Sequence, residues 1–174
     1  MQAALLTRRR VQELHRKRGI TVTNNERYEV RAKLEEGGMG AVYLAHDHRL
    51  ARDLAIKVIK PEYTKPAAEE RLRREAHMLA RLAHPNIVQV LDFSGPDDGD
   101  GLFFVMEYVK GADFGELLPN CKLVERLDII AEVCKGLDYI HSHGLVHRDV
   151  KPENVLVSVT GDVKLADFGL GRAI

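Results

Sequence analysis

Tryptophan is absent from the sequence, cysteine occurs only twice, and no long apolar run interrupts it. Cys121 and Cys134 are too few for a disulfide framework and lack the spacing of metal ligands, which favours a reducing, cytoplasmic setting. Without an apolar segment near the N-terminus we expect no secretory leader, and no run approaches the length of a membrane span. The 26 basic residues balance the 26 acidic ones, so net charge indicates neither a nucleic-acid polymer nor a membrane as a partner.

The composition that remains is typical of a soluble globular protein, with 45% apolar and 30% charged residues. Its 174 residues are enough to bury one sizeable core. Basic residues crowd residues 1–27, which we interpret as an N-terminal extension. Within residues 1–20, Glu13 alone opposes the basic side chains of Arg8, Arg9, Arg10, Arg16, Lys17 and Arg18. A short basic helix in this extension is either solvated or an arm for a membrane surface or a partner.

Strand-type sequence begins at residue 28 and is then broken by three glycines. Residues 28–34 alternate loosely, Gly37-Gly38-Met39-Gly40 follows, and residues 41–45 resume a strand pattern. We therefore predict two strands joined by a glycine-rich turn. Such a turn either cradles a phosphate with its backbone N–H groups or simply closes a hairpin.

A lysine and a glutamate occupy inward positions on the next two elements. Residues 54–59 predict a strand whose Lys57 shares a face with apolar neighbours, and residues 67–83 predict a helix whose Glu75 lies on the apolar stripe. Because a buried ammonium is costly without an anion, Lys57 and Glu75 are candidate ion-pair partners. The alternatives are that Lys57 reaches water at the strand edge and that Glu75 lies at the edge of the stripe.

Two further strands precede a change to helical sequence. Residues 87–93 and 102–109 predict strands, and Lys110-Gly111 marks a linker near a boundary between two lobes. Residues 116–118 then predict a short helical piece that Pro119 ends.

A long helix and a hairpin complete the pattern. Residues 122–142 predict the helix, with Gly144 just past its C-terminus, and residues 155–159 and 163–166 predict the hairpin. The expected apolar stripe of the helix consists of Leu123, Leu127, Ile130, Val133 or Cys134, Leu137, and Ile140 or His141.

Residues 147–154, His-Arg-Asp-Val-Lys-Pro-Glu-Asn, concentrate charged and amide side chains between the helix and the hairpin. A turn without a further role does not need Asp149 and Asn154 with Lys151 between them, whereas a loop that holds a hydroxyl, a phosphate and a metal ion does. The hairpin then returns Asp167-Phe168-Gly169 toward this loop. Asn154 and Asp167 would converge as oxygen ligands of the kind that Mg²⁺ takes beside substrate phosphates, although Asp-Phe-Gly alone also fits an ordinary turn.

Together these motifs resemble the catalytic domain of serine/threonine protein kinases, and most closely the bacterial kinases of eukaryotic type. Over about residues 28–172 they occur in the family's order, as the glycine turn, Ala55-Ile56-Lys57, Glu75, the 147–154 loop and Asp167-Phe168-Gly169. The resemblance implies an α+β, bilobal protein-kinase-like fold, with an antiparallel β-sheet N-lobe that carries one main helix and an incomplete, mostly helical C-lobe. The implied divisions are the extension 1–27, the N-lobe 28–108 and a partial C-lobe 109–174.

The resemblance also implies roles for individual residues. Asp149 would accept the proton of a Ser/Thr hydroxyl on a protein substrate, and Lys151 would steady the transferred phosphoryl group. Lys57, held by Glu75, would contact the phosphates of ATP, and Asn154 and Asp167 would hold Mg²⁺. The implied ATP-binding positions are Leu34, Gly37, Gly40, Val42, Ala55, Lys57, Met106, Glu107, Val109, Asp113 and Leu156.

Two departures from the family accompany these assignments. Glu35 stands where the family usually has glycine, which we expect to weaken nucleotide binding. The sequence also stops soon after Gly169, so we expect a fragment of a longer kinase. In such a fragment part of the long helix should be uncovered, at Leu127, Ile130, Val133 and Leu137.

The leading hypothesis for function is ATP-dependent phosphoryl transfer to Ser/Thr hydroxyls of proteins. A non-catalytic nucleotide-binding or scaffold module of the same fold is the first alternative. A small-molecule phosphotransferase is the second, and it is disfavoured by Arg148 and by Lys151-Pro152-Glu153-Asn154. The sequence predicts no oligomeric state.

Overall fold

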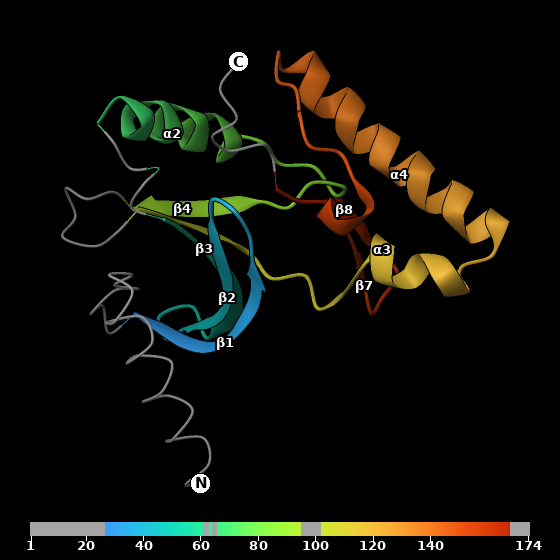
Figure 1. The fold of residues 1–174 in the computed structure, drawn as a ribbon, viewed down its shortest axis with the longest axis horizontal. Coiled ribbons are helices and arrows are strands. Elements are labelled where there is room, and N and C mark those ends of the chain that lie inside the picture. Colours follow the sequence, from blue (N-terminus) through green and yellow to red (C-terminus); the bar gives the residue numbers. More distant parts are fainter. Residues whose placement is uncertain (1–26, 61–62, 64–65, 95–101, 168–174) are drawn as a thin grey trace, which may run out of the picture. The chain divides into compact units, whose positions relative to one another are not determined.

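The computed structural model of the chain describes residues 27–60, 63, 66–94 and 102–167, and it divides into two compact units (Figure 1). The first unit comprises the chain up to His77 together with Val90–Tyr108, and the second comprises Met78–Gln89 together with the chain from Val109 onwards. The basic extension, apart from Arg27, and Phe168-Gly169 lie outside the described residues.

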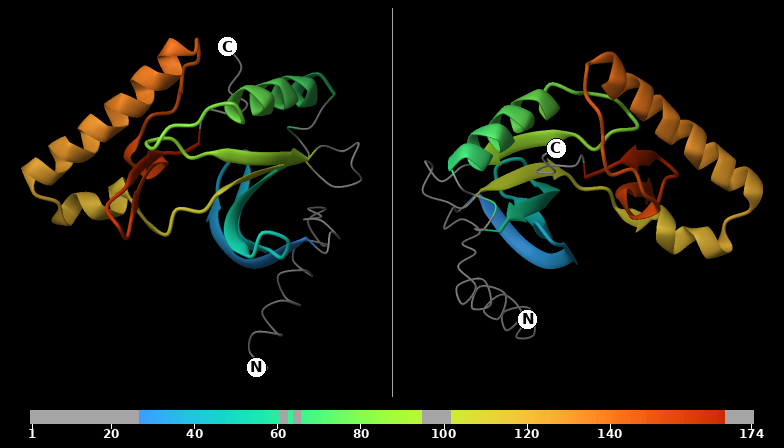
Figure 2. Two further views of the ribbon diagram at one scale, coloured as in Figure 1. Left: turned by 180° about the vertical axis from the view of Figure 1, so that it is seen from behind. Right: turned by 45° about the horizontal axis from the view of Figure 1, so that its top comes forward.

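Five antiparallel strands form the sheet of the first unit, in the order β1-β2-β3-β5-β4. Their bounds are β1 Tyr28–Glu36, β2 Gly40–Asp47, β3 Arg52–Ile59, β4 Val90–Ser94 and β5 Phe103–Glu107. The helix α2, Pro66–Leu79, lies alongside β4 in each view (Figures 1 and 2). The sequence predicted all six elements, and this sheet with its helix confirms the expected fold class.

Two boundaries in this region differ from the prediction. The helix α2 ends at Leu79 rather than at residue 83, because Arg81 and Leu82 donate their N–H groups to carbonyls three residues back and tighten the last turn. The strand β4 begins at Val90 rather than at residue 87, because Ile87 forms an isolated parallel bridge with Leu165 instead.

The main core of the first unit lies on one face of its sheet. Its members alternate along the strands and are Tyr28, Ala41, Tyr43, Ala45, Leu54, Ile56, Val58, Phe103 and Val105. Leu54 and Ile56 are 1% and 0% exposed, and burial of each stabilises the fold by about 1.5–3 kcal/mol. Because successive strand residues point to opposite faces, the residues between these core positions are left for the other face.

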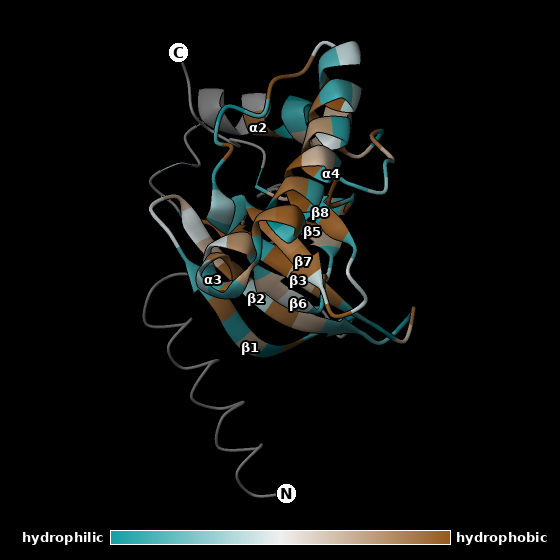
Figure 3. Ribbon diagram, turned by 90° about the vertical axis from the view of Figure 1, so that its right-hand side faces the viewer, coloured by the Kyte–Doolittle hydropathy of each residue, from teal (hydrophilic) through white to brown (hydrophobic). Residues whose placement is uncertain are grey.

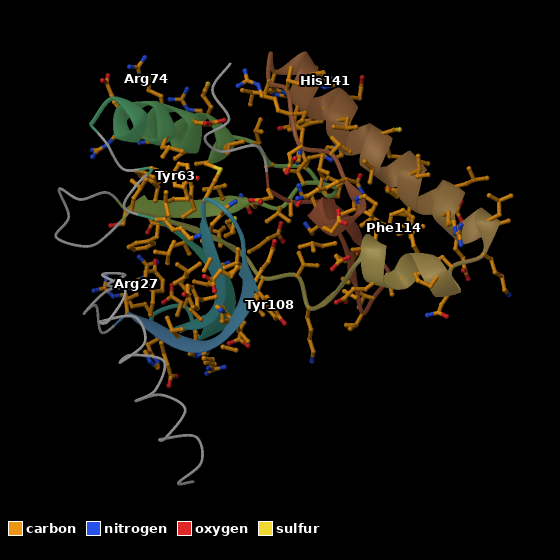
Figure 4. All side chains as sticks on the ribbon, in the orientation of Figure 1. Arg27, Tyr63, Arg74, Tyr108, Phe114 and His141 are labelled. Carbon is orange, nitrogen blue, oxygen red and sulfur yellow. The ribbon has the colours of Figure 1, made fainter. Side chains whose placement is uncertain are left out.

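An ion pair fastens the start of the first unit's sheet to the end of β2. The guanidinium of Arg27, labelled in Figure 4, lies 3.1 Å from a carboxylate oxygen of Asp47. Asp47 is fully buried and also accepts the N–H groups of Arg49 at 2.8 Å and Leu50 at 3.1 Å. Burial alone would raise the pKa of Asp47, but these donors hold it below its usual value.

The second unit combines a three-stranded antiparallel sheet, in the order β6-β7-β8, with two α-helices and two short 3₁₀ turns. The bounds are β6 Gly111–Asp113, α3 Phe114–Leu117, η3 Leu118–Asn120, α4 Leu123–Ser142, η4 Pro152–Asn154, β7 Val155–Ser158 and β8 Val163–Leu165. Its core, which includes the Phe114 labelled in Figure 4, consists of Phe114, Ile129, Val133, Val155, Val163 and Leu165.

The strand β6 was not predicted, because Lys110-Gly111 reads as a linker. Gly111 is required there by packing, since a Cβ on it would lie 1.9 Å from the carbonyl oxygen of Val157 in β7. The helical piece also differs from the prediction, since α3 begins at Phe114 and Pro119 lies inside η3 rather than ending a helix. Proline suits the first turn of η3, where its missing N–H has no partner to lose.

The helix α4 matches its predicted span, and Gly144 follows it with a left-handed φ of 73°. Its buried residues are Ile129, Val133, Gly136 and Ile140, so the predicted stripe is confirmed at Val133 and Ile140 but not at Leu123, which is exposed. Leu127 and Ile130 are exposed and Leu137 is half-buried, as expected for a partly uncovered helix, whereas Val133 is buried. Hydrophobic and hydrophilic residues alternate in bands along α4 (Figure 3).

Gly136 lies on the side of α4 that packs against the 84–87 loop. A Cβ on Gly136 would lie 2.8 Å from the carbonyl oxygen of Asn86, so glycine allows α4 to approach the 84–87 loop closely. The side-chain amide of Asn86 donates to Glu132 and to the carbonyl of Val163, both at 3.0 Å. Among the helices of the described residues, none has the length and apolarity needed to cross a membrane.

Candidate active site

The register of the first unit's strands gathers several predicted ATP-binding residues on the face of the sheet opposite its main core. Val42 pairs with Lys57, and Ala55 pairs with Met106. Residues directly opposite in an antiparallel pair share a face, and so do residues two apart on one strand. Val42, Ala55, Lys57 and Met106 therefore lie on one face, as their predicted role requires.

Lys57 is 7% exposed, in the middle of β3. Its register partners are Val42 and Phe104, so its aliphatic stem lies among apolar neighbours. Glu75 is half-buried on α2, beside the buried Leu72 and Ala76. The burial of Lys57 rules out the alternative that it reaches water at a strand edge, while its ion pair with Glu75 stays a prediction.

The glycine turn between β1 and β2 contains glycines of two kinds. A Cβ on Gly40 would lie 2.1 Å from the carbonyl oxygen of Val58, so Gly40 is needed for β2 to pack against β3. A Cβ on Gly37 or Gly38 would meet no atom within 4 Å, and neither residue has a left-handed φ. Packing and backbone conformation therefore do not require glycine at these two positions, and their contact with phosphates stays a prediction.

The other predicted ATP-binding positions differ in exposure. Leu34 is 46% exposed near the end of β1, while Met106, Glu107 and Val109 are half-buried around the end of β5. In the second unit, Asp113 in β6 pairs with Leu156 in β7, so these two lie on one face of the small sheet. The contacts of all these residues with ATP stay predictions.

Asp113 also has a structural role that sequence reasoning missed. Its carboxylate accepts the N–H of Glu116 at 3.0 Å and caps α3. Such a cap contributes about 1 kcal/mol. The signal was available, since Asp lies three residues before Glu at the start of a short helical segment.

A buried histidine fixes the charged loop of the second unit. His147 is 1% exposed, and its Nε2–H donates to the carbonyl oxygen of Ala166 at 2.8 Å. Its Nδ1 accepts the N–H of Asp149 at 3.3 Å, so one tautomer uses both ring nitrogens. Burial lowers the pKa of His147, while the hydrogen bond to Ala166 and the charges of Asp167 and Asp149 oppose this shift. The ring is thus a neutral bridge between the two segments that carry Asp149 and Asp167.

Two side chains of the loop, those of Asn154 and Lys151, lie close to the carboxylate of Asp149. The Asn154 side-chain nitrogen donates to the carbonyl oxygen of Asp149 at 2.7 Å and to its Oδ2 at 3.1 Å. The Lys151 ammonium lies 3.5 Å from the same Oδ2. The carboxylate of Asp149 is 19% exposed and the ammonium of Lys151 is 46% exposed, so the pair is open to solvent on one side.

The backbone then brings Asp167 to this loop. Asn154 is 4% exposed, and its backbone carbonyl oxygen accepts the N–H of Ala166 at 2.8 Å. Asp167 is the residue after Ala166. Both Asp167 and Arg148 have left-handed backbones, with φ of 57° and 66°. Non-glycine residues in this region cost about 1 kcal/mol or more, and they concentrate at functional sites.

The oxygen donors of this loop suit Mg²⁺ held together with phosphates. The side-chain nitrogen of Asn154 donates hydrogen bonds to Asp149, so the side-chain oxygen of Asn154 is the atom that could bind a metal. Asp167 would add a carboxylate. Among the described residues, no group of three or more His, Cys, Asp or Glu side chains is arranged to hold a metal without other ligands. Magnesium in phosphate-transfer sites takes one or two carboxylates plus substrate oxygens, so the residues present fit it.

Comparisons with known proteins identify the family of the chain. A family model described as protein kinase domain matches residues 28–174. The serine/threonine-protein kinase PknB of Mycobacterium leprae is 40% identical over 156 residues, which are 86% of this chain and 25% of that protein. PknA of Mycobacterium tuberculosis is 40% identical over 162 residues, which are 89% of this chain and 38% of that one.

Solved structures show the same likeness. The crystal structure of the Mycobacterium tuberculosis PknI kinase domain matches with a TM-score of 0.72 and 32% sequence identity, covering 85% of this chain and 62% of that one. The chain spans only 25% of the length of the Mycobacterium leprae PknB and 38% of the length of the Mycobacterium tuberculosis PknA.

Proposed function

The chain belongs to the protein kinase domain family, and from that membership we propose that it carries the ATP-binding and phosphoryl-transfer residues of a serine/threonine protein kinase. The observation that carries this proposal is the arrangement around Asp149. A carboxylate is held 3.1 Å from the Asn154 amide and 3.5 Å from the Lys151 ammonium, in a loop fixed by a buried, neutral histidine. A preorganised carboxylate with one open side is what a general base for a hydroxyl requires.

In the proposed reaction Asp149 accepts the proton of a Ser or Thr hydroxyl on a protein substrate. The hydrogen bond from Asn154 orients the carboxylate, so that Asp149 meets the hydroxyl without a further rearrangement. The Lys151 ammonium lies beside the Asp149 carboxylate, where it would offset negative charge that develops on the transferred phosphoryl group. General-base assistance of this kind is worth about 10²–10⁴-fold in rate.

ATP with Mg²⁺ would supply the phosphoryl group. In the first unit, Gly37 and Gly38 would admit the phosphates, and Lys57, oriented by Glu75, would bind them. Apolar side chains on the sheet face and in β7 would cover the adenine, namely Leu34, Val42, Ala55, Met106 and Leu156. In the second unit, Asn154 and Asp167 would hold the metal, and Asp113 would approach the ribose with the carboxylate oxygen not used as a helix cap.

We also propose protein substrates with Ser or Thr residues as partners and a cytoplasmic location for this part of the chain. The free thiols of Cys121 and Cys134 support the location, because a reducing compartment keeps cysteines in that state.

The experiment is a transfer assay with radiolabelled ATP, Mg²⁺ and a generic protein substrate, made with the 174-residue chain. Asp149→Asn removes the base but retains the shape, and we expect kcat to fall by about 10²–10⁴-fold with the KM for ATP little changed. Asp128→Asn, at an exposed position of α4, is the matched control and should retain activity.

Two results would count against the proposal. Equal transfer by the wild-type chain and Asp149→Asn would show that Asp149 is not the base. ATP binding without transfer in the wild-type chain would favour the alternative of a non-catalytic nucleotide-binding or scaffold module.

A further inference from the structure

Lys60, which no motif singled out, makes two contacts with the glycine turn. It follows the last residue of β3, and its Nζ donates to the carbonyl oxygen of Gly37 at 2.9 Å. Its backbone N–H donates to the carbonyl oxygen of Met39, also at 2.9 Å. A single residue outside the turn therefore holds two of the turn's four carbonyl groups.

The turn has little else to hold its conformation at Gly37 and Gly38. Neither glycine has a neighbour within 4 Å of the position of a Cβ, and both are exposed. One hydrogen bond closes the turn internally, from the N–H of Gly37 to the carbonyl oxygen of Gly40 at 2.9 Å. Because glycine has the largest backbone freedom of any residue, contacts from outside the turn decide how well ordered it is.

The direction of one carbonyl also determines the direction of the next N–H. Peptide bonds in the described residues are all trans, so the carbonyl of Gly37 and the N–H of Gly38 lie in one plane and point in opposite directions. When the Lys60 ammonium holds the Gly37 carbonyl, the N–H of Gly38 is aimed away from Lys60. Fixed, outward N–H groups in a glycine turn are donors for phosphate oxygens.

The charge of Lys60 matters for the same ligand. Two carboxylates, Glu35 and Glu36, lie directly before the turn, and Glu36 is already paired with Lys33 at 2.6 Å. The ammonium of Lys60 places a cation on the turn backbone itself. It therefore offsets an acidic surrounding that would otherwise repel a polyphosphate.

We propose that Lys60 is a positioning residue for the phosphates of ATP, which acts by holding the Gly37 carbonyl so that the Gly38 N–H is directed to a phosphate oxygen. This role rests on the proposed function, because it presupposes that the glycine turn binds ATP. Lys60 itself would make no contact with ATP. Its contribution is preorganisation of a turn that would otherwise lose conformational freedom on binding.

The test compares ATP and adenosine binding to the 174-residue chain by titration calorimetry, for the wild type and three variants. Lys60→Met keeps the aliphatic stem and the backbone N–H but removes the ammonium, and Lys60→Arg restores a cationic donor. Lys33→Met removes the same charge from the base of the turn, where the ammonium contacts a side chain rather than the turn backbone.

We expect Lys60→Met to weaken ATP binding by about fivefold to tenfold, the size of a lost charge-assisted hydrogen bond at an exposed site, and to leave adenosine binding unchanged. Lys60→Arg should remain within about twofold of the wild type for both ligands, and so should Lys33→Met. Hydrogen exchange of the Gly38 amide should be faster in Lys60→Met while exchange in β2 and β3 stays the same.

Each of three results would overturn the role of Lys60. They are unchanged ATP affinity in Lys60→Met, an equal loss of adenosine affinity, and an equal loss of ATP affinity in Lys33→Met, which would indicate bulk charge alone. If the wild-type chain binds no ATP, the proposed function fails and the nucleotide role of Lys60 fails with it. If it binds ATP and Lys60→Met binds equally well, only the role of Lys60 fails.

Discussion

The first unit presents its candidate residues on the face of a regular sheet, and the second unit presents them in loops. In the first, Val42, Ala55 and Lys57 reach one face because strand residues alternate and the main core takes the other face. In the second, Asp149 and Asn154 reach their positions through hydrogen bonds with each other and with a buried histidine. Strand periodicity arranges one set. Hydrogen bonds within the 147–154 loop, together with the one from His147 to Ala166, arrange the other.

Because of this difference, we expect the two units to differ in how well they tolerate substitutions. A sheet face tolerates the loss of one side chain, because every backbone hydrogen bond of the ladder remains. A loop held by few contacts does not, because a buried donor or acceptor left without a partner costs about 1–3 kcal/mol. The second unit also holds Arg148 and Asp167 in left-handed conformations, which persist only while the surrounding contacts require them.

The largest effect should follow from His147→Leu. Leucine is close in volume but leaves the carbonyl of Ala166 and the N–H of Asp149 without their present partners, so we expect a loss of about 3 kcal/mol in the free energy of unfolding. Hydrogen exchange should show the loss in the second unit, with β2 and β3 of the first unit unaffected. Equal destabilisation of both units would remove the contrast between them.

Gly40→Ala should break the first unit at one of the few points where its sheet depends on a single residue. The new Cβ would lie 2.1 Å from the carbonyl oxygen of Val58, so β2 and β3 must separate, at a cost of about 2 kcal/mol. Gly38→Ala is the control, because its Cβ meets no atom within 4 Å. Chemical denaturation measures both variants, and similar stabilities would show that the sheet accommodates Gly40→Ala by a shift of the strands.

Acidification should destabilise the second unit through His147. Burial holds its pKa in the folded state below the usual 6.5, so as the pH falls below about 6.5 the unfolded chain takes up a proton that the folded chain does not. The free energy of unfolding should therefore decrease as the pH falls through this range. His147→Leu removes the titrating ring, so the melting temperature of the variant should fall less steeply with acidification than that of the wild type. Parallel pH dependence of the two melting temperatures would show that another group is responsible.

Glu35→Gly should have the smallest effect and concerns only the first unit. Glu35 is exposed at the end of β1, directly before Glu36 and the glycine turn, so its charge acts on a bound polyphosphate through solvent. We expect the affinity for ATP to rise by about twofold to fivefold, with adenosine affinity unchanged. An unchanged ATP affinity would show that the departure from the family at this position is neutral.

The sequence predicted the strands of the first unit well because their signal is local. Alternation, β-branched residues and the glycine turn all lie within a few residues of each other, and they place Lys57 on its face without knowledge of the fold. The boundaries were less certain, since the end of α2 depends on hydrogen bonds of its last turn and the start of β4 depends on the partner that Ile87 finds.

The errors in the second unit have a common cause in tertiary contacts. Periodicity predicted α4 and two of its buried residues, Val133 and Ile140, but it missed Gly136, because a glycine that faces the Asn86 loop carries no apolar signal. The strand β6 was missed because Gly111 reads as a linker unless the approach of β7 is known. Lys60 carried no signal at all, since the acceptor of its side chain, the carbonyl of Gly37, lies 23 residues away.

By itself the sequence determined the order of the elements, the face that carries Lys57 and the residue types on which the proposed phosphoryl transfer rests, because these follow from local spacing. Only the tertiary structure decided which side chains hold others in place. It made His147 a neutral bridge between the Asp149 loop and the segment before Asp167, and it connected Lys60 to Gly37. The physical reason is that a hydrogen bond between distant segments depends on a distance in space, which spacing along the chain does not encode.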